Sequence, residues 1–72
     1  MTQPTPAAGG TAFELLERVR REVTGARQTF VLARLSLRCG FDVKALAPDD
    51  RDADRAARLR AAIREVCPQV PL

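Results

Sequence analysis

The sequence predicts an all-α fold, a small domain of three helices that forms a dimer. Apolar residues recur three and four positions apart over most of the chain, which is the period of a half-buried helix. Residues with helix-capping side chains stand where the periodic stretches begin. The chain has only 72 residues, so its core is small and self-association is expected to supplement it.

The first helix is expected over residues 11–24. Thr11 and Glu14 have the spacing of a capping box, in which each side chain accepts a hydrogen bond from the backbone amide of the other residue. Gly25 then supplies a stop. The spacing of apolar residues continues beyond this glycine, so one long helix from Thr11 to Cys39 is the alternative, although an interior glycine costs about 1 kcal/mol relative to alanine.

A second helix is expected over residues 28–39. Its Leu, Ala and Arg residues favour helix, and Gly40 follows at the position of a helix C-cap. The segment from Ala33 to Cys39 also alternates apolar and polar residues, which is the period of a strand. The alternative is therefore an α+β fold in which residues 29–39 form a strand. Such a strand would pair with its copy across a dimer, because an unpaired edge invites association.

Two further helical segments are expected after Gly40. Asp42 is placed to cap a short helix that reaches Leu46. The last helix is expected over residues 50–66, with Asp49 or Asp50 as its cap. Further aspartates follow in its first turn and arginines toward its end, which is the charge order that the helix dipole favours.

The chain is expected to hold one domain, residues 11–67, between a disordered N-terminal tail at 1–10 and an extended C-terminal tail at 68–72. Both tails contain proline, and the first also contains two glycines. The apolar stripes exceed what one monomer of this size can cover, so we predict a homodimer. The expected core consists of Phe13, Leu16, Val19, Val23, Phe30, Leu35, Leu37, Phe41, Leu46, Leu59, Ile63 and Val66.

Few residues of this chain can carry chemistry. It has two cysteines and no histidine, so the usual base beside a nucleophile and the usual zinc ligands are missing. Cys39 and Cys67 are expected to be buried, reduced thiols. The alternate aspartates from Asp50 resemble the start of a calcium loop, but Arg55 stands where that loop needs a glycine. We therefore expect no enzymatic activity, no metal, no cofactor and no small-molecule substrate.

The charge and hydropathy of the chain bear on its location and partners. No signal-peptide pattern begins the sequence, and no apolar run is long enough to cross a membrane, so a cytoplasmic protein without a membrane partner is expected. The formal net charge is +3, yet nine carboxylates are interspersed among the twelve basic residues. This is a mixed-charge surface, which permits a DNA partner without requiring one.

From Leu35 to Leu46 the sequence resembles a helix-turn-helix motif. Ser36 has the place of the small residue in the first helix, and Gly40 has the place of the turn glycine. The second helix of such a motif offers several donors to DNA, whereas this segment offers one lysine. In this interpretation the residues that contact DNA are Arg34, Arg38 and Lys44.

The leading functional interpretation is a non-enzymatic protein-interaction module, such as an adaptor, a chaperone-like subunit or a regulator that acts through helix packing. Its partner would be a second copy of the chain or another protein. The alternative is a small DNA-binding transcriptional regulator. The residues expected to form the interaction stripe are Leu16, Val19, Val23, Phe30, Leu37, Leu59, Ile63 and Val66.

Overall fold

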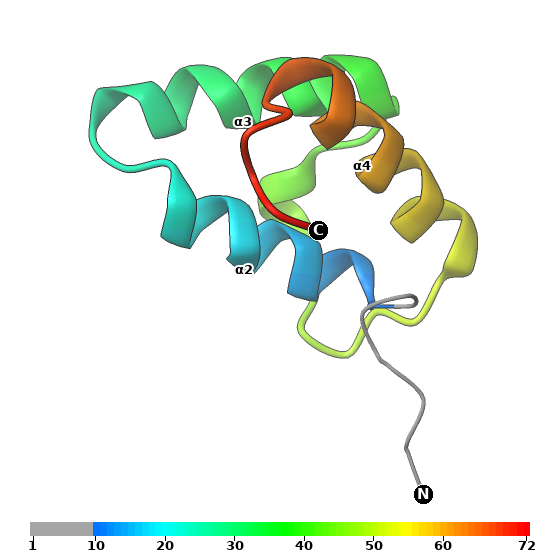
Figure 1. Ribbon diagram of the computed structural model, residues 1–72. Helices are drawn as coiled ribbons and strands as arrows, with labels where there is room; N and C mark the ends of the chain where they lie inside the picture. The colour runs from blue at the N-terminus through cyan, green and yellow to red at the C-terminus, as the bar shows by residue number, and fades with distance from the viewer. Residues whose placement is uncertain (1–9) are drawn as a thin grey trace, which may run out of the picture.

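The computed structural model describes residues 10–72, and in this range it is a compact domain of three α-helices and one short 3-10 helix without any strand (Figure 1). The all-α, three-helix prediction is confirmed, and the alternative with a strand at residues 29–39 is wrong. The predicted N-terminal tail lies, apart from Gly10, outside the described residues. The elements are α2 (Ala12–Glu22), α3 (Ala26–Cys39), η1 (Val43–Ala45) and α4 (Ala53–Val66).

Helix α2 begins with the predicted capping box. The Thr11 hydroxyl accepts a hydrogen bond of 3.1 Å from the Glu14 amide, and the Glu14 carboxylate accepts one of 3.0 Å from the Thr11 amide. These bonds satisfy two backbone donors that the first turn of a helix leaves unpaired. The buried face of α2 then consists of Ala12, Leu15, Leu16 and Val19.

The chain turns between α2 and α3, so the single long helix is wrong. Gly25 has φ +71° and ψ −157°, a conformation that only glycine adopts readily. The Gln28 side-chain amide donates to the carbonyl oxygens of Arg20 and Val23, at 3.2 and 2.8 Å, and so closes the end of α2. The turn is therefore fixed by one glycine and one side chain.

Helix α3 ends at the predicted glycine. Gly40 has φ +81° and ψ 13°, the left-handed conformation in which glycine commonly ends a helix, and its amide donates to the Ser36 carbonyl at 3.0 Å. The Arg58 guanidinium, from α4, donates to the Cys39 carbonyl at 3.4 Å. A cation at this end of the helix is favourable because the helix dipole is negative there.

The short helix predicted after Gly40 is present as a single 3-10 turn, η1. As predicted, Asp42 caps it, and its carboxylate accepts a hydrogen bond of 3.0 Å from the Lys44 amide. The Ser36 hydroxyl, on α3, accepts a hydrogen bond of 3.0 Å from the Val43 amide. This bond and the buried Val43 side chain tie η1 to α3.

Helix α4 begins three residues later than the sequence suggested, because Asp52 caps it and neither Asp49 nor Asp50 does. The Asp52 carboxylate accepts a hydrogen bond of 3.0 Å from the Arg55 amide. Asp50 instead accepts from the Asp52 amide and from the Arg55 guanidinium, both at 2.9 Å. Asp50 therefore orders the loop that leads into the helix.

The core lies where α4 packs against both α2 and α3, which diverge from the turn that joins them (Figure 1). The prediction that Phe30 and Leu37 belong to this core is wrong, since both side chains are exposed. Val31 and Leu32 take their place on α3, and Val70 of the C-terminal segment is also buried. Four predicted core residues are only partly buried against this core, namely Phe13, Phe41, Leu46 and Val66.

The C-terminal segment lies over the core and does not extend away from it. Beyond α4, the Val70 amide donates to the Cys67 carbonyl at 3.0 Å, which makes a turn. The Arg18 guanidinium, on α2, donates to the Pro71 carbonyl at 2.8 Å. The segment therefore closes against α2, as the path of the chain shows (Figure 1). Among residues 10–72, none of the helices has the length and apolar character of a membrane span.

Candidate interaction surface on helix α3

Helix α3 is apolar on two sides, and only one side is covered. Val31, Leu32, Leu35 and Cys39 are buried against the rest of the domain. On the opposite side Phe30 is 72% exposed and Leu37 is 83% exposed. We call the surface formed by Ala26, Phe30, Ala33 and Leu37 the outer face of α3. Its residues are four, three and four positions apart, so they lie in one row along the helix.

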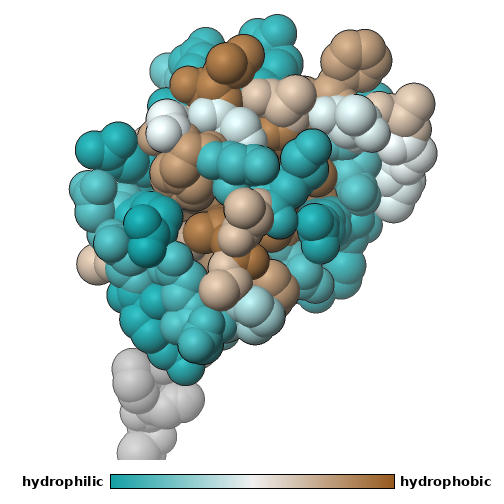
Figure 2. Space-filling view, turned by 180° about the vertical axis from the view of Figure 1, so that it is seen from behind, coloured by the Kyte–Doolittle hydropathy of each residue, from teal (hydrophilic) through white to brown (hydrophobic). Residues whose placement is uncertain are grey.

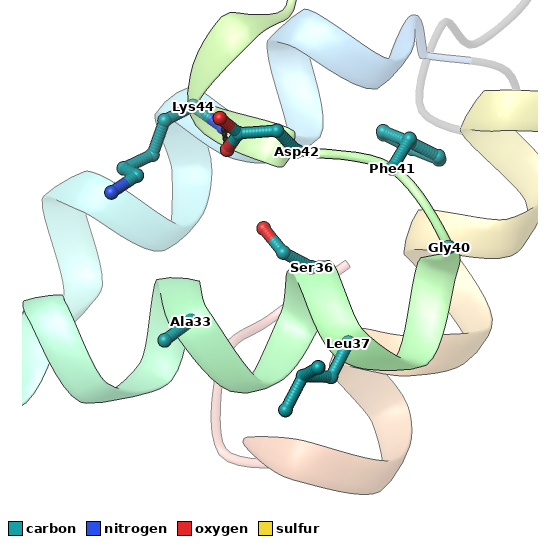
Figure 3. Close-up of a pocket in the computed structure, with 7 residues that line it drawn as sticks. All are labelled: Ala33, Ser36, Leu37, Gly40, Phe41, Asp42 and Lys44. Carbon is teal, nitrogen blue, oxygen red and sulfur yellow. Dashed lines mark hydrogen bonds between the residues drawn. The ribbon is translucent and has the colours of Figure 1, made fainter.

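A hollow of about 660 Å³ lies beside the C-terminal half of the outer face. Figure 3 shows one wall formed by α3 and the other by the segment that follows Gly40, with the Lys44 side chain extending along the helix. The Ser36 hydroxyl points from α3 toward this second wall. The lining residues are Ala33, Ser36, Leu37, Gly40, Phe41, Asp42 and Lys44.

The shape of the hollow follows from contacts already described. Gly40 turns the chain back at the end of α3, and the hydrogen bond from the Val43 amide to Ser36 fixes the distance at which η1 runs beside the helix. Ala33 has a small side chain and Gly40 has none, so neither residue fills the hollow. Phe41 is half-buried and forms the apolar end of the second wall.

Most of the charges around the outer face are positive. Helix α3 contains three arginines and no acidic residue. Arg27 and Arg34 are exposed and stand seven positions apart along one margin, and neither side chain has a hydrogen bond or ion pair with any residue in 10–72. Arg38 is paired with Glu65 of α4. Lys44, on the other side of the hollow, is exposed. Asp42 also lines the hollow, and its exposed carboxylate accepts the hydrogen bond that caps η1.

Most of the predicted interaction stripe lies in the core and not on the surface. Five of its residues are buried, namely Leu16, Val19, Val23, Leu59 and Ile63. Val66 is partly buried against them. Phe30 and Leu37 remain, and they are the two large side chains of the outer face. The exposed residues of the predicted stripe thus lie on one side of α3.

The structure does not contain the helix-turn-helix that the sequence resembles. The second helix of that motif would have to reach Leu46, but η1 spans only Val43–Ala45 and α4 begins at Ala53. Of the three residues that this interpretation assigned to DNA contact, Arg34 and Lys44 are exposed on opposite sides of the outer face. Arg38 is engaged by Glu65. No recognition helix is therefore available at this place.

The two cysteines lie in surroundings that make their thiols unreactive. Both side chains are buried, and burial raises the pKa of the Cys39 and Cys67 thiols, partly offset by Arg58 beside Cys39 and by Arg27 beside Cys67. A raised pKa lowers the fraction of the reactive thiolate. Within residues 10–72 no group of three His, Cys, Asp or Glu side chains is placed to hold a metal ion.

A second, smaller hollow of about 330 Å³ lies on the other side of Phe41. It is bordered by Leu46 and by the ion pair between Asp50 and Arg55, whose side-chain atoms are 2.9 Å apart. Asp50 and Arg55 are thus already paired with each other, and the third charged residue of the lining, Asp42, accepts the hydrogen bond that caps η1. This hollow offers a ligand no unpaired cation, unlike the margins of the outer face.

The space-filling view from behind shows apolar side chains at the surface among hydrophilic ones (Figure 2). They gather at the top of this view and along its centre. Exposed apolar groups that lie next to each other, bordered by polar residues, are typical of sites that bind other molecules.

Comparison of the chain with models of protein families, with curated proteins and with solved structures finds no match.

Proposed function

We propose that this chain is a non-enzymatic protein-interaction module that acts through the outer face of α3, and that its partner is a second copy of the chain or another protein. One observation carries the proposal. Phe30 and Leu37 are exposed on a helix whose other side already completes the core. The fold does not need these two side chains, so their apolar character is explained by a contact outside the monomer.

The energy available from such a contact is sufficient for binding. Complete burial of a Phe or Leu side chain contributes roughly 1.5–3 kcal/mol each. Large apolar anchors near the centre of an interface usually carry most of its binding energy. Phe30 and Leu37 are two turns apart on one row, and the hollow beside Leu37 gives a partner side chain a place to enter.

The test compares two double variants. Phe30→Asp with Leu37→Asp places two charges on the outer face, and Ala57→Asp with Ala61→Asp places the same charges on exposed positions of α4. Affinity capture from the native cytosol identifies partners, and sedimentation velocity reports self-association. We expect the first variant to lose binding by about a hundredfold or more, because two buried anchors are removed. Unchanged capture and self-association of this variant would refute the proposal.

Nucleic-acid binding is the second candidate, and the exposed cations Arg27, Arg34 and Lys44 favour it. Such cations hold phosphates without reading sequence, so affinity for duplex DNA should fall steeply as salt is raised. Fluorescence anisotropy of a labelled mixed-sequence duplex at low and physiological salt measures this. Absence of binding at low salt would eliminate this candidate and leave the first proposal intact.

A further inference from the structure

We infer that the outer face of α3 binds an amphipathic helix from another protein whose apolar stripe is flanked by Asp and Glu residues. This inference rests on the proposed function and adds the chemistry of the partner. It is carried by the row of the outer face, by the hollow beside it and by the sign of the charges along its margins.

The geometry of the outer face suits a helix. Phe30 and Leu37 alternate with Ala26 and Ala33 along one row, so large side chains stand next to small ones. A partner helix places its own side chains over the small positions, as knobs enter holes between packed helices. The row covers eleven steps of the helix, about 17 Å at 1.5 Å per residue, which corresponds to a partner segment of three to four turns.

The charges of the outer face select acidic flanks. Arg27 and Arg34 lie on one margin, and Lys44 lies across the hollow on the other, where Asp42 is the single carboxylate of the lining. Cations therefore outnumber carboxylates along the apolar row by three to one. Within residues 10–72 none of these three cationic side chains has a hydrogen-bond or ion-pair partner. Charges of complementary sign across an interface speed association and exclude partners of the wrong charge. A partner helix with glutamates beside its apolar stripe supplies carboxylates that can pair with these cations.

A second copy of the chain fits this surface less well. Two α3 helices packed antiparallel on their outer faces would bring Arg27 and Arg34 of both copies to one seam, to which α3 itself contributes no carboxylate. Like charges in such positions are destabilising. The N-terminal residues 1–9 cannot serve either, since they include no acidic residue and no large apolar side chain apart from Met1.

Most carboxylates of the chain are also already engaged. Glu17 pairs with Arg20, Glu65 with Arg38 and Asp54 with Arg58. Those that cap or border helices accept backbone or arginine hydrogen bonds, namely Glu14, Asp42, Asp50 and Asp52. At the outer face, among the residues that the structure describes, Arg27, Arg34 and Lys44 have no ion-pair partner and Asp42 is the single carboxylate, so further carboxylates are expected on a different protein.

The test uses three synthetic helical peptides of about 18 residues, a length that covers the row. They share one leucine stripe and carry Glu, Gln or Lys at the positions beside it. Fluorescence anisotropy measures their affinity for the full chain. We expect the Glu peptide to bind about tenfold more tightly than the Gln peptide at low salt, because three exposed ion pairs each contribute modestly. Raising the salt should remove this advantage.

A charge-reversal variant of the chain is tested with the same three peptides, so differences in peptide solubility cannot explain a change of preference. In Arg27→Glu with Arg34→Glu, the preference is expected to shift from the Glu peptide to the Lys peptide. The matched control is Arg21→Glu with Arg64→Glu, which changes the charge equally at exposed positions on α2 and α4. This control should keep the preference of the parent chain. Circular dichroism of each variant establishes that the helices are retained.

The outcomes separate this inference from the proposed function. If all three peptides bind equally well and the variant Phe30→Asp with Leu37→Asp abolishes their binding, the preference for acidic flanks is overturned. The outer face is then supported as a binding site. A dimer that the same variant dissociates, with no peptide binding, would identify the second copy as the partner and overturn the inference. Binding of duplex DNA with no peptide binding and no dimer would overturn both.

Discussion

One side chain fixes the path of the backbone after α2, and another does so after α3. Ser36 holds η1 through the Val43 amide, and Gln28 closes the end of α2 through two carbonyl oxygens. From the sequence alone, Ser36 has the place of the small residue in a helix-turn-helix motif. Its role depends on a backbone group seven positions later, which helix periodicity does not reveal.

Ser36→Ala should lower the free energy of unfolding by about 1–2 kcal/mol. The substitution leaves the Val43 amide without its acceptor, and an unsatisfied backbone donor costs about this amount. Chemical unfolding in urea measures the change. Thr29→Ala is the matched control, since Thr29 is an exposed hydroxyl residue on the same helix. Equal stabilities of the two variants would show that the bond to η1 contributes nothing.

The buried thiols predict how stability depends on pH. Burial raises the pKa of Cys39 and Cys67 in the folded chain above the value of 9.0 that applies to an exposed thiol. Below pH 9 both states keep the thiols protonated, so their contribution is fully present. Above it the unfolded chain releases protons first, and stability falls as the pH rises through the folded pKa.

We therefore expect unfolding free energies that are flat from about pH 6 to 8 and that decline above about pH 9. Urea unfolding at each pH measures them, and a variant with Cys39→Ala and Cys67→Ala should lose the decline whatever its absolute stability. Native alkylation by iodoacetamide should also be slow at neutral pH, since the thiols are buried. Fast modification of the folded chain would contradict this account.

At the scale of the elements, the helices could largely be predicted and the orientation of α3 could not. The capping box of α2, the stop at Gly25 and the C-cap at Gly40 are local signals, and the structure contains all three. The row through Phe30 and Leu37 continues the stripe of α2 only if the helix is unbroken. The turn at Gly25 restarts the helix with a new phase, so Val31 and Leu32 face the core instead.

The same limit applies to the start of α4 and to the interaction surface. Three aspartates precede that helix within four positions, and each could serve as a cap. Asp52 does so because Asp50 is held by Arg55, a contact that only the folded loop creates. The sequence could therefore identify the apolar residues of the candidate site, but the fold was needed to separate Phe30 and Leu37 from those in the core.

The two turn glycines should respond differently to substitution. Gly40→Ala should cost about 1–2 kcal/mol because the left-handed conformation disfavours a side chain, and Gly40→Asn should cost less, since asparagine tolerates it. At Gly25, with ψ near −157°, both Ala and Asn should cost up to about 3 kcal/mol, although no atom lies within 4 Å of an added Cβ. Thermal unfolding of the four variants checks this, and an equal effect of Asn at both sites would refute it.

At the scale of the whole molecule, α4 unites the domain. It packs against both α2 and α3, and its Leu59 and Ile63 side chains are fully buried in the shared core. The outer face of α3 points away from this core. The residues of α3 that pack in the core and those of the proposed binding surface therefore lie on opposite sides of α3, so variants should alter stability and the proposed binding separately.

Two leucine substitutions test this separation. Leu59→Ala should destabilise the monomer by about 3 kcal/mol, since it removes a buried side chain and leaves a cavity. Leu37→Ala should change monomer stability by less than about 0.5 kcal/mol, because that side chain is exposed. Urea unfolding of both variants at concentrations where the chain is monomeric measures the difference. A comparable loss in both would mean that Leu37 contributes to the core.

The position of α4 also bears on the order of folding events. The α2–α3 hairpin is closed locally by Gly25 and Gln28, but its two arms diverge and hold little of the core between them (Figure 1). Short helices without tertiary contacts are marginal in water. We expect the hairpin to form only transiently until α4 docks, so that the rate-limiting step is a long-range collapse and the chain folds with a single kinetic barrier.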